Sequence, residues 1–253
     1  MKILLTNDDG INSDGIQKMA ACLRSVGKHK VTVVAPVQNR SAVSQAITVI
    51  NEPVKIVNLG EDNWSCSGTP SDCVIAALKG DFCEKPDLVL SGINQGANLG
   101  TDIIFSGTAA AARQASLYGV PAIALSLKTR ELFHWDMAAS WVLEHLDELI
   151  EFWRENTFVN VNIPNRPEGP LGILTSWPGI KHYNDTLSVK KDEEGSLLCS
   201  LSWGKESVVY EAGSDLDVVS RNYVSVSTLN NFSVVIRDCC PGAPDYAAVA
   251  ARS

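Results

Sequence analysis

The sequence has no long apolar run. None of its 253 residues lies in a stretch of the roughly 18 uninterrupted apolar residues that a membrane-spanning helix needs. The N-terminal run Met1-Lys2-Ile3-Leu4-Leu5 is followed by Asn7-Asp8-Asp9 too soon to form a secretory signal. We therefore expect a cytoplasmic protein with no membrane partner.

The sequence also lacks the cysteine spacing of a disulfide framework or a zinc site. It has seven cysteines, an odd number, and no two of them form a C-x-x-C motif. We expect reduced thiols throughout. The adjacent Cys239 and Cys240 leave a redox-active pair as the alternative, which is the weaker one because vicinal disulfides are strained.

Positive charge is scarce. The chain has 21 Lys and Arg against 29 Asp and Glu, which gives a formal net charge of -8. Affinity for nucleic acid rests mainly on neutralising phosphates with Lys and Arg, so a nucleic-acid polymer is not an expected partner. A small anionic substrate needs only local positive charge and remains compatible with this balance.

Two common nucleotide-binding signatures are absent as well. The chain contains no G-x-x-x-x-G-K-[ST], and the spacing of Gly92, Gly96 and Gly100 is not G-x-G-x-x-G. The P-loop and dinucleotide-binding folds are therefore excluded as explanations of the glycine-rich segment.

Short apolar runs alternate with helical patterns through the first two thirds of the chain, and 45% of all residues are hydrophobic. This alternation predicts an α/β fold, a Rossmann-like, mainly parallel sheet flanked by helices. The expected strands are residues 2–6, 30–35, 46–50, 86–90, 121–127 and 158–163, and the expected helices begin near residues 16, 73 and 109, with a long one over 133–155.

The last third changes character, with short β runs and turns beyond Pro164. We predict an α/β core over residues 1–165 that carries the site, and a β-rich C-terminal extension over residues 166–253. Residues 192–195 form the expected tip of a hairpin between strands at 186–189 and 197–201, and residues 223–229 form a further strand. Exposed hairpin edges need covering, so we expect the extension to mediate oligomerisation.

Two adjacent carboxylates, Asp8 and Asp9, follow the first expected strand. In open α/β sheets, ligands bind at the carboxyl ends of the strands. Such a pair can cap a helix, hold a metal, or supply an aspartyl nucleophile with its acid partner. The D-x-D spacing of haloacid-dehalogenase-type phosphatases disfavours the third, because Asn7 or Gly10 would replace one carboxylate. Two uncompensated like charges favour the metal over a simple cap.

Further oxygen donors lie in the loops after two other expected strands. These are the Ser41 hydroxyl and the Asn94 carbonyl, and none of the four histidines lies in these loops. A donor set of oxygen atoms indicates a hard divalent cation, Mg²⁺ or Mn²⁺.

The segment Ser106-Gly107-Thr108 precedes an alanine-rich helix. Its backbone N–H groups and two hydroxyls can bind an anion at the positive end of the helix dipole. The alternative is a simple N-cap followed by close helix packing, and spacing alone does not choose between the two.

Five ordered motifs resemble the SurE family in residues and spacing. They are Thr6-Asn7-Asp8-Asp9-Gly10, Ala35-Pro36 with Asn39-Arg40-Ser41, Ser67-Gly68-Thr69-Pro70-x-Asp72-Cys73-Val74, Ser91-Gly92-Ile93-Asn94-x-Gly96-x-Asn98-x-Gly100, and Ser106-Gly107-Thr108. The resemblance covers the α/β core to about Leu127. One departure is Ala42-Val43 after Ser41, where glycine is common in the family.

The resemblance implies a metal-dependent nucleotidase that removes phosphate from nucleoside monophosphates and forms dimers or tetramers. It implies metal ligation by Asp8, Asp9, Ser41 and Asn94, and phosphate contacts from Asn98, Ser106, Gly107 and Thr108. We expect nucleoside 5′-monophosphates as the substrates, with 3′-nucleotides and short polyphosphate as further candidates that the sequence leaves open.

We therefore expect metal-assisted hydrolysis of a phosphomonoester with no protein nucleophile. Either aspartate could accept the proton of the attacking water, and Asp9 is the marginally better candidate. No His or Lys stands near the motifs in sequence, which leaves the metal to stabilise the leaving group. The rival from another class is a non-catalytic nucleotide or phosphate sensor that uses the same donors.

Overall fold

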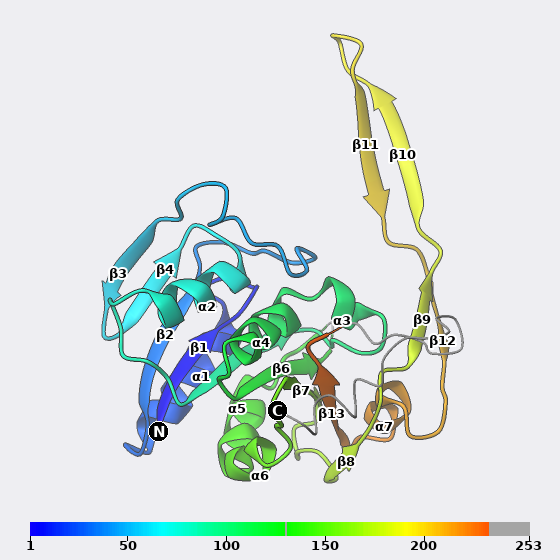
Figure 1. Cartoon of the computed structure of the whole chain (residues 1–253). Coiled ribbons are helices and arrows are strands. Elements are labelled where there is room, and N and C mark those ends of the chain that lie inside the picture. The colour runs from blue at the N-terminus through cyan, green and yellow to red at the C-terminus, as the bar shows by residue number, and fades with distance from the viewer. Residues whose placement is uncertain (130, 233–253) are drawn as a thin grey trace, which may run out of the picture.

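The structure, a computed structural model, describes residues 1–129 and 131–232, so the Cys239–Cys240 pair lies outside the described residues. Within this part of the chain, nine strands form one twisted central sheet (Figure 1). In spatial order they are β3 (Ile56–Gly60), β4 (Asn63–Cys66), β2 (Lys30–Pro36), β1 (Lys2–Thr6), β5 (Leu88–Gln95), β6 (Ala122–Lys128), β7 (Thr157–Pro164), β13 (Val224–Asn230) and β8 (Ile173–Thr175).

The middle of the sheet is parallel, as the alternating pattern predicts. The pairs β4–β2, β2–β1, β1–β5, β5–β6 and β6–β7 are all parallel. Antiparallel pairing occurs toward the two edges, where β3 joins β4 and β13 joins β7. The carboxyl ends of β1, β2 and β5 therefore meet at one edge of the sheet, which brings their loops together.

Helices cover both faces of the sheet because successive strand residues point to opposite sides. On one face Ile3 and Leu5 of β1 pack in a core with α1 (Asp14–Ser25), α5 (Trp135–Glu144) and α6 (Leu146–Ile150). On the other, Leu4 packs with α2 (Pro70–Lys79) and α4 (Gly107–Leu117). The central strands are thus largely apolar on both faces, as expected for a parallel sheet.

The expected strand at residues 46–50 is wrong, because these residues lie in an irregular loop. The backbone N–H groups of Thr48 and Val49 donate to the Asp72 carboxylate of α2 instead of to a neighbouring strand. The antiparallel pair β3 and β4 lies at one edge of the sheet instead. Its outer strand, β3, is largely exposed, so its sequence has no clear apolar pattern.

The expected long helix over residues 133–155 is also wrong. The helix α5 ends at Glu144, and α6 covers only Leu146–Ile150. His145 between them has φ -106° and ψ 11°, outside the helical region, and its Nδ1 lies 2.9 Å from the Trp141 carbonyl oxygen. Apolar spacing continues through the break, so periodicity alone does not show it.

A long projection, which we call the arm (residues 180–209), leaves the body of the molecule (Figure 1). Its base is the antiparallel pair β9 (Ile180–Tyr183) and β12 (Glu206–Val209), and its outer part is the hairpin β10 (Thr186–Lys191) and β11 (Leu197–Ser202). The predicted tip is confirmed: the Asp192 carboxylate accepts hydrogen bonds from the N–H groups of Glu194 and Ser196.

The chain returns to the central sheet after the arm. The short helix α7 (Asp215–Ser220) leads into β13, which pairs with β7 over six residues, and β8 covers the far edge of β13. Part of the predicted extension therefore belongs to the main sheet, while the arm stands apart from it. No helix in the described part of the chain is long and apolar enough to cross a membrane.

Candidate active site

The turn after β1 is built by Asn7. The Asn7 side chain is buried, its Nδ2 donates to the Gly10 carbonyl oxygen at 2.9 Å and to the Ser13 hydroxyl at 2.7 Å, and its Oδ1 accepts from the Gly10 N–H at 3.2 Å. These bonds close the loop within a few residues and fix the start of α1. Asn7 thus holds the loop that carries Asp8 and Asp9.

Asp8 is buried against the start of α4. Its carboxylate accepts a hydrogen bond from the Thr108 hydroxyl, and only 4% of the residue is exposed. A Cβ atom on Gly107 would lie 2.8 Å from the Asp8 Cβ and 3.0 Å from its Oδ2. Only glycine allows this approach, so the Ser106-Gly107-Thr108 segment packs against Asp8 and orients it.

Asp9 is anchored to β5. Its Oδ2 accepts from the backbone N–H of Gln95 at 2.9 Å. Burial raises the pKa of Asp8 to about 6, the Thr108 hydrogen bond opposes this, and the neighbouring Asp9 charge adds to it. Burial also raises the pKa of Asp9. Two adjacent, partly desolvated carboxylates make a site that a cation would stabilise.

The loop after β2 brings Ser41 to the aspartates. The Arg40 N–H donates to the Asp8 carbonyl oxygen at 2.7 Å, and the Arg40 guanidinium donates to the Ser67 carbonyl oxygen at 2.7 Å. Ser41 itself is exposed, and its N–H donates to the Asn39 side chain at 2.8 Å. These contacts tie the Ser41 loop to the segment of Asp8, and Ser41 lines one cavity with Asp8 and the other with Asp9.

Asp72 fixes the far end of the same loop. Besides the Thr48 and Val49 N–H groups at 3.0 and 3.1 Å, its carboxylate accepts the Thr48 hydroxyl and the Thr69 N–H, the latter at 2.9 Å. Burial alone would raise the pKa of Asp72, but these hydrogen bonds lower it below its ordinary value. Asp72 has no role among the predictions from sequence, although it lies in one of the five motifs.

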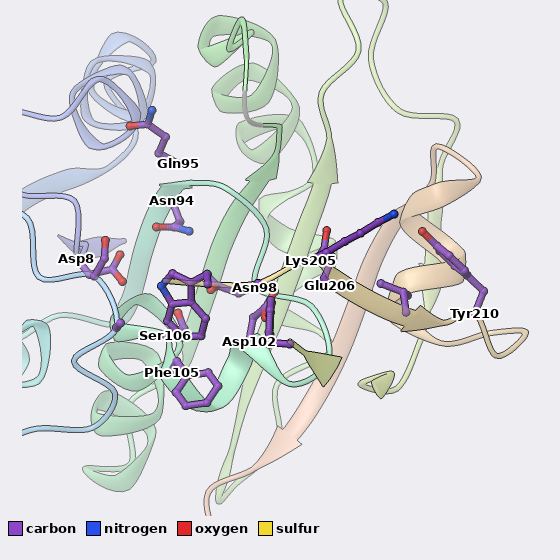
Figure 2. A pocket seen from close by; sticks show the side chains of 16 residues that line it. Asp8, Asn94, Gln95, Asn98, Asp102, Phe105, Ser106, Lys205, Glu206 and Tyr210 are labelled. Carbon is purple, nitrogen blue, oxygen red and sulfur yellow. The ribbon is translucent and has the colours of Figure 1, made fainter. Parts of the chain in front are cut away.

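Asn94 lies near the end of β5, beside β1. Its Nδ2 donates to the Gly96 carbonyl oxygen at 2.9 Å. Figure 2 shows the oxygen of this side chain on the side where Asp8 lies. The carbonyl that the sequence predicts as a ligand therefore lies toward the side of the cavity lined by Asp8.

Asn98 is held by a buried polar network. Its N–H donates to Asn162 Oδ1 and its Nδ2 donates to the Ser126 hydroxyl, both at 2.8 Å. Its carbonyl oxygen accepts from the side chains of Asn160 and Asn162, both at 3.0 Å. This support was not predicted from sequence, although two asparagines in the apolar strand β7 were a visible signal.

Six of the eight predicted site residues line two adjoining cavities. The first, of about 900 Å³, is lined by Asp8, Ser41, Asn94, Asn98 and Ser106 among others (Figure 2). The second, of about 720 Å³, is lined by Asp9 and again by Ser41. Gly107 and Thr108 line neither cavity and instead lie behind Asp8.

The opposite wall comes from the arm and the residues that follow it, which the sequence did not place at the site. Figure 2 shows Lys205, Glu206 and Tyr210 across the cavity from Asp8. The base of the arm is held by Asp102 of the short helix α3 (Asp102–Phe105), which accepts from Lys181 Nζ at 2.6 Å and from the Tyr183 hydroxyl.

Positive charge is present at the cavities, although no Lys is near the motifs in sequence. Lys205 lines the first cavity, and Lys128 and Lys181 line the second. Burial lowers the pKa of Lys128, and the charge of Lys181 adds to this effect. Folding therefore brings to the cavities lysines that are distant from the motifs in sequence, while stabilisation of the leaving group by the metal stays a prediction.

The donor set fits a hard divalent cation. Asp8, Asp9, Ser41 and Asn94 offer carboxylate, hydroxyl and amide oxygens, which Mg²⁺ and Mn²⁺ prefer. In residues 1–129 and 131–232, no group of three or more His, Cys, Asp or Glu is arranged to hold a metal. A zinc-type site is thus not indicated in that part of the chain.

Comparison with known proteins identifies the family. Residues 3–185 match the family model described as Survival protein SurE. The chain belongs to the SurE family. The resemblance that the five motifs carry is confirmed, and the match extends through β7 and into the base of the arm.

SurE relatives are similar over nearly their whole length. The 5'-nucleotidase SurE of Thermoanaerobacter sp. (strain X514) is 38% identical over 239 residues, which cover 91% of this chain and 92% of that protein. The 5'-nucleotidase SurE of Carboxydothermus hydrogenoformans is 39% identical over 242 residues, 91% of this chain and 90% of that protein.

A solved SurE structure has the same fold. The crystal structure of the SurE protein from Aquifex aeolicus superposes with a TM-score of 0.80 at 34% sequence identity, and covers 95% of this chain and 97% of that chain. The predicted α/β fold with a mainly parallel sheet is confirmed by this likeness and by the strand pairing.

Proposed function

We propose that this chain is a metal-dependent nucleotidase that hydrolyses nucleoside 5′-monophosphates to nucleoside and phosphate. The observation that carries the proposal is that Asp8, Ser41, Asn94 and Ser106, from four separate segments, open into one cavity of about 900 Å³. Similarity to proteins named 5'-nucleotidase SurE over about nine tenths of the chain supports the substrate class. We propose 3′-nucleotides and short polyphosphate as secondary substrates.

One Mg²⁺ or Mn²⁺ is the proposed cofactor, with Asp8, Asp9, Ser41 and Asn94 as its ligands. When bound, such a cation lowers the pKa of a water molecule and polarises phosphoryl oxygens. The protein's own contribution is to hold the ligands in place. Thr108 and Gly107 orient Asp8, Gln95 anchors Asp9, and Arg40 fixes the loop of Ser41.

Asp9 is the proposed acceptor of the proton from the attacking water. It is more exposed than Asp8, and it lines the second cavity while Asp8 is buried against α4. Burial raises the pKa of the Asp9 carboxyl, which makes its carboxylate a stronger base than an ordinary aspartate.

Ser106 and Asn98 are the proposed phosphate contacts. The Ser106 hydroxyl accepts from the Ala109 N–H at 3.0 Å, so its own proton is available for a phosphoryl oxygen. Ser106 also stands at the N-terminus of α4, where the helix dipole favours an anion. Gly107 and Thr108 support this segment from behind, through their contacts with Asp8.

Phosphate release from AMP tests the proposal. We expect release with Mn²⁺ or Mg²⁺, and its loss on adding a chelator. Binding of AMP without release would instead indicate a nucleotide sensor. Trapping of a phosphoenzyme would indicate covalent aspartyl chemistry and would contradict the proposed role of water.

We also propose that the chain forms a homodimer or homotetramer through the arm. Five large apolar side chains of the outer hairpin are more than half exposed: Leu187, Val189, Leu197, Leu198 and Leu201. Such a surface on a hairpin with open edges fits a second copy of the chain.

A further inference from the structure

Three aromatic rings form a cluster at the wall of the first cavity. The ring of Trp203 lies 6.0 Å from that of Phe105 and 5.4 Å from that of Tyr183, with interplanar angles of 64° and 68°. All three residues line the cavity that also contains Asp8 and Ser106. The residues come from α3, from β9 and from the segment that follows β11, so only the folded chain brings them together.

The cluster is braced from two sides. The Tyr183 hydroxyl donates to Asp102, which also accepts from Lys181 Nζ at 2.6 Å. The Phe105 carbonyl oxygen accepts from the Ser44 N–H at 3.1 Å, which ties it to the loop that carries Ser41. The edge contacts of these two rings therefore position Trp203 against a fixed frame.

Trp203 nevertheless keeps much of its surface open. It is 56% exposed, and Phe105 is 40% exposed. Large aromatic side chains usually bury their area, and an exposed indole at the wall of a cavity offers a flat apolar face to a planar ligand.

The cluster lies close to the proposed phosphate site. Phe105 directly precedes Ser106 in the chain, and Gly107 after it packs against Asp8. Trp203 is thus linked to the Asp8 carboxylate through one ring contact and a short stretch of chain. Figure 2 shows Phe105 and Ser106 next to each other on the wall of the cavity that Asp8 also lines.

We propose that Trp203 is a specificity-determining residue that stacks on the base of the nucleotide while the phosphate lies at Ser106 and Asp8. The proposal rests on the nucleotidase function above and names its substrate more closely. Every base has a face that can stack on an aromatic ring, but the purine ring is larger and covers more of the indole. Purine nucleotides are therefore the preferred class.

The test compares AMP with ribose 5-phosphate, which has the same phosphate and sugar but no base. In Trp203→Ala, KM for AMP should rise about tenfold or more, the range that base–aromatic stacking supports, with kcat nearly unchanged. KM for ribose 5-phosphate should stay the same. The KM of CMP should rise less than that of AMP, and Trp203→Phe should restore most of the loss.

Trp177→Ala is the matched control, because Trp177 is also an exposed tryptophan, at 48%, and lines neither of the two cavities. It should leave both KM values unchanged. Equal changes for AMP and ribose 5-phosphate in Trp203→Ala, or none in either, would overturn the proposal and assign Trp203 to bracing the arm.

A binding measurement separates this proposal from the nucleotidase function. Tryptophan fluorescence of the wild type should be quenched by adenosine, which has a base and no phosphate, and Trp203→Phe should lose that quenching. If the wild type hydrolyses neither phosphate ester, the nucleotidase function fails while the quenching still tests stacking. Quenching that persists in Trp203→Phe would contradict the stacking, because the signal would come from another of the six tryptophans.

Discussion

The loop around Ser41 is irregular but is held by hydrogen bonds to the rest of the chain, whereas the outer hairpin of the arm is regular but exposed. Residues 39–49 contain no helix or strand, but their backbone is tied to Asp8, Asp72 and Phe105. The hairpin β10–β11 has six cross-strand pairs in regular register, and every residue of both strands is exposed.

The difference shows what fixes a segment in this molecule. An irregular loop is rigid where buried acceptors take its N–H groups, because releasing them would leave polar groups without partners. A two-stranded hairpin is marginal in water without a surface to pack on. The site loops are therefore held by their own chain, while both strands of the outer hairpin are exposed, as expected if the proposed second copy packs on them.

Truncation after Pro164 should have the largest effect. It removes the arm but also β13, which pairs with β7 from Ser225↔Asn162 to Asn230↔Thr157 and buries Val224 and Val226 in the core. The exposed edge of β7 would then be free to pair with other chains. We expect insoluble protein, measured by sedimentation of the expressed fragment. A soluble, fully active fragment would refute the need for this part of the chain.

Asp8→Asn should abolish most activity while leaving the fold intact. The change removes a charged ligand and keeps the shape, so we expect a loss of at least about 100-fold in kcat/KM and a lower affinity for Mn²⁺. Because a ligand stabilises the state that binds it, Mn²⁺ should raise the Tm of the wild type more than that of the variant. Equal shifts would place the cation elsewhere, and near-normal activity at low metal would exclude Asp8 as a ligand.

Asp72→Asn should loosen the Ser41 loop from a distance. An amide offers one acceptor oxygen where the carboxylate accepts from Thr48, Val49 and Thr69, and its NH₂ group would face donors. We expect roughly 10- to 100-fold weaker Mn²⁺ binding by calorimetry, as for other supports of metal ligands. Asp136→Asn is the control, because that carboxylate is 82% exposed. If Asp72→Asn lowers the Tm but leaves the Mn²⁺ affinity unchanged, the role of Asp72 is limited to capping α2, and its proposed support of the Ser41 loop is wrong.

The free energy of unfolding of the metal-free protein should depend on pH through the buried Asp8 carboxyl. The pKa of Asp8 is raised from 3.8 to about 6 by burial, so its contribution to stability is fully present below about pH 4 and is lost as pH rises through 6. The loss should reach about 3 kcal/mol at most. Urea unfolding with a chelator, from pH 4 to 7, should show a smaller loss in Asp8→Asn. If the unfolding free energies of the wild type and Asp8→Asn change with pH in the same way, the Asp8 carboxyl is not the source of the pH dependence.

Much of the site could be predicted from sequence because its residues lie in local motifs at strand ends. Turn residues after apolar runs give the positions of Asp8, Ser41 and Asn94, and the parallel order brings those ends together. The family resemblance added their proposed roles. The roles themselves stay predictions until the metal and phosphate are measured.

Long-range contacts could not be predicted in the same way. Residues 46–50 have a strand-like composition, but the distant Asp72 captures their N–H groups. The sequence predicts the strand near residue 223 but not that it pairs with β7. Trp203 follows an exposed hairpin, and only the return of the chain places it against Phe105. Each of these depends on tertiary packing, which local pattern does not contain.

Removing the outer hairpin alone should have the smallest effect on the folded body. Thr186 and Ser202 are cross-strand partners, so an Asn-Gly turn can replace residues 187–201 between them. The removed side chains are exposed, so we expect the free energy of unfolding of the isolated protomer in urea to change by less than about 1 kcal/mol. Assembly should be lost: light scattering should give an oligomer for the wild type and a single chain for the variant. The wild-type Tm should rise with protein concentration, because association stabilises the folded state by mass action, and that of the variant should not. A wild type that scatters only as a 27.3 kDa species at micromolar concentration would contradict the role of the arm. A variant that still assembles would show that another surface joins the copies, and the proposed role of the exposed leucines of the arm in assembly would be wrong.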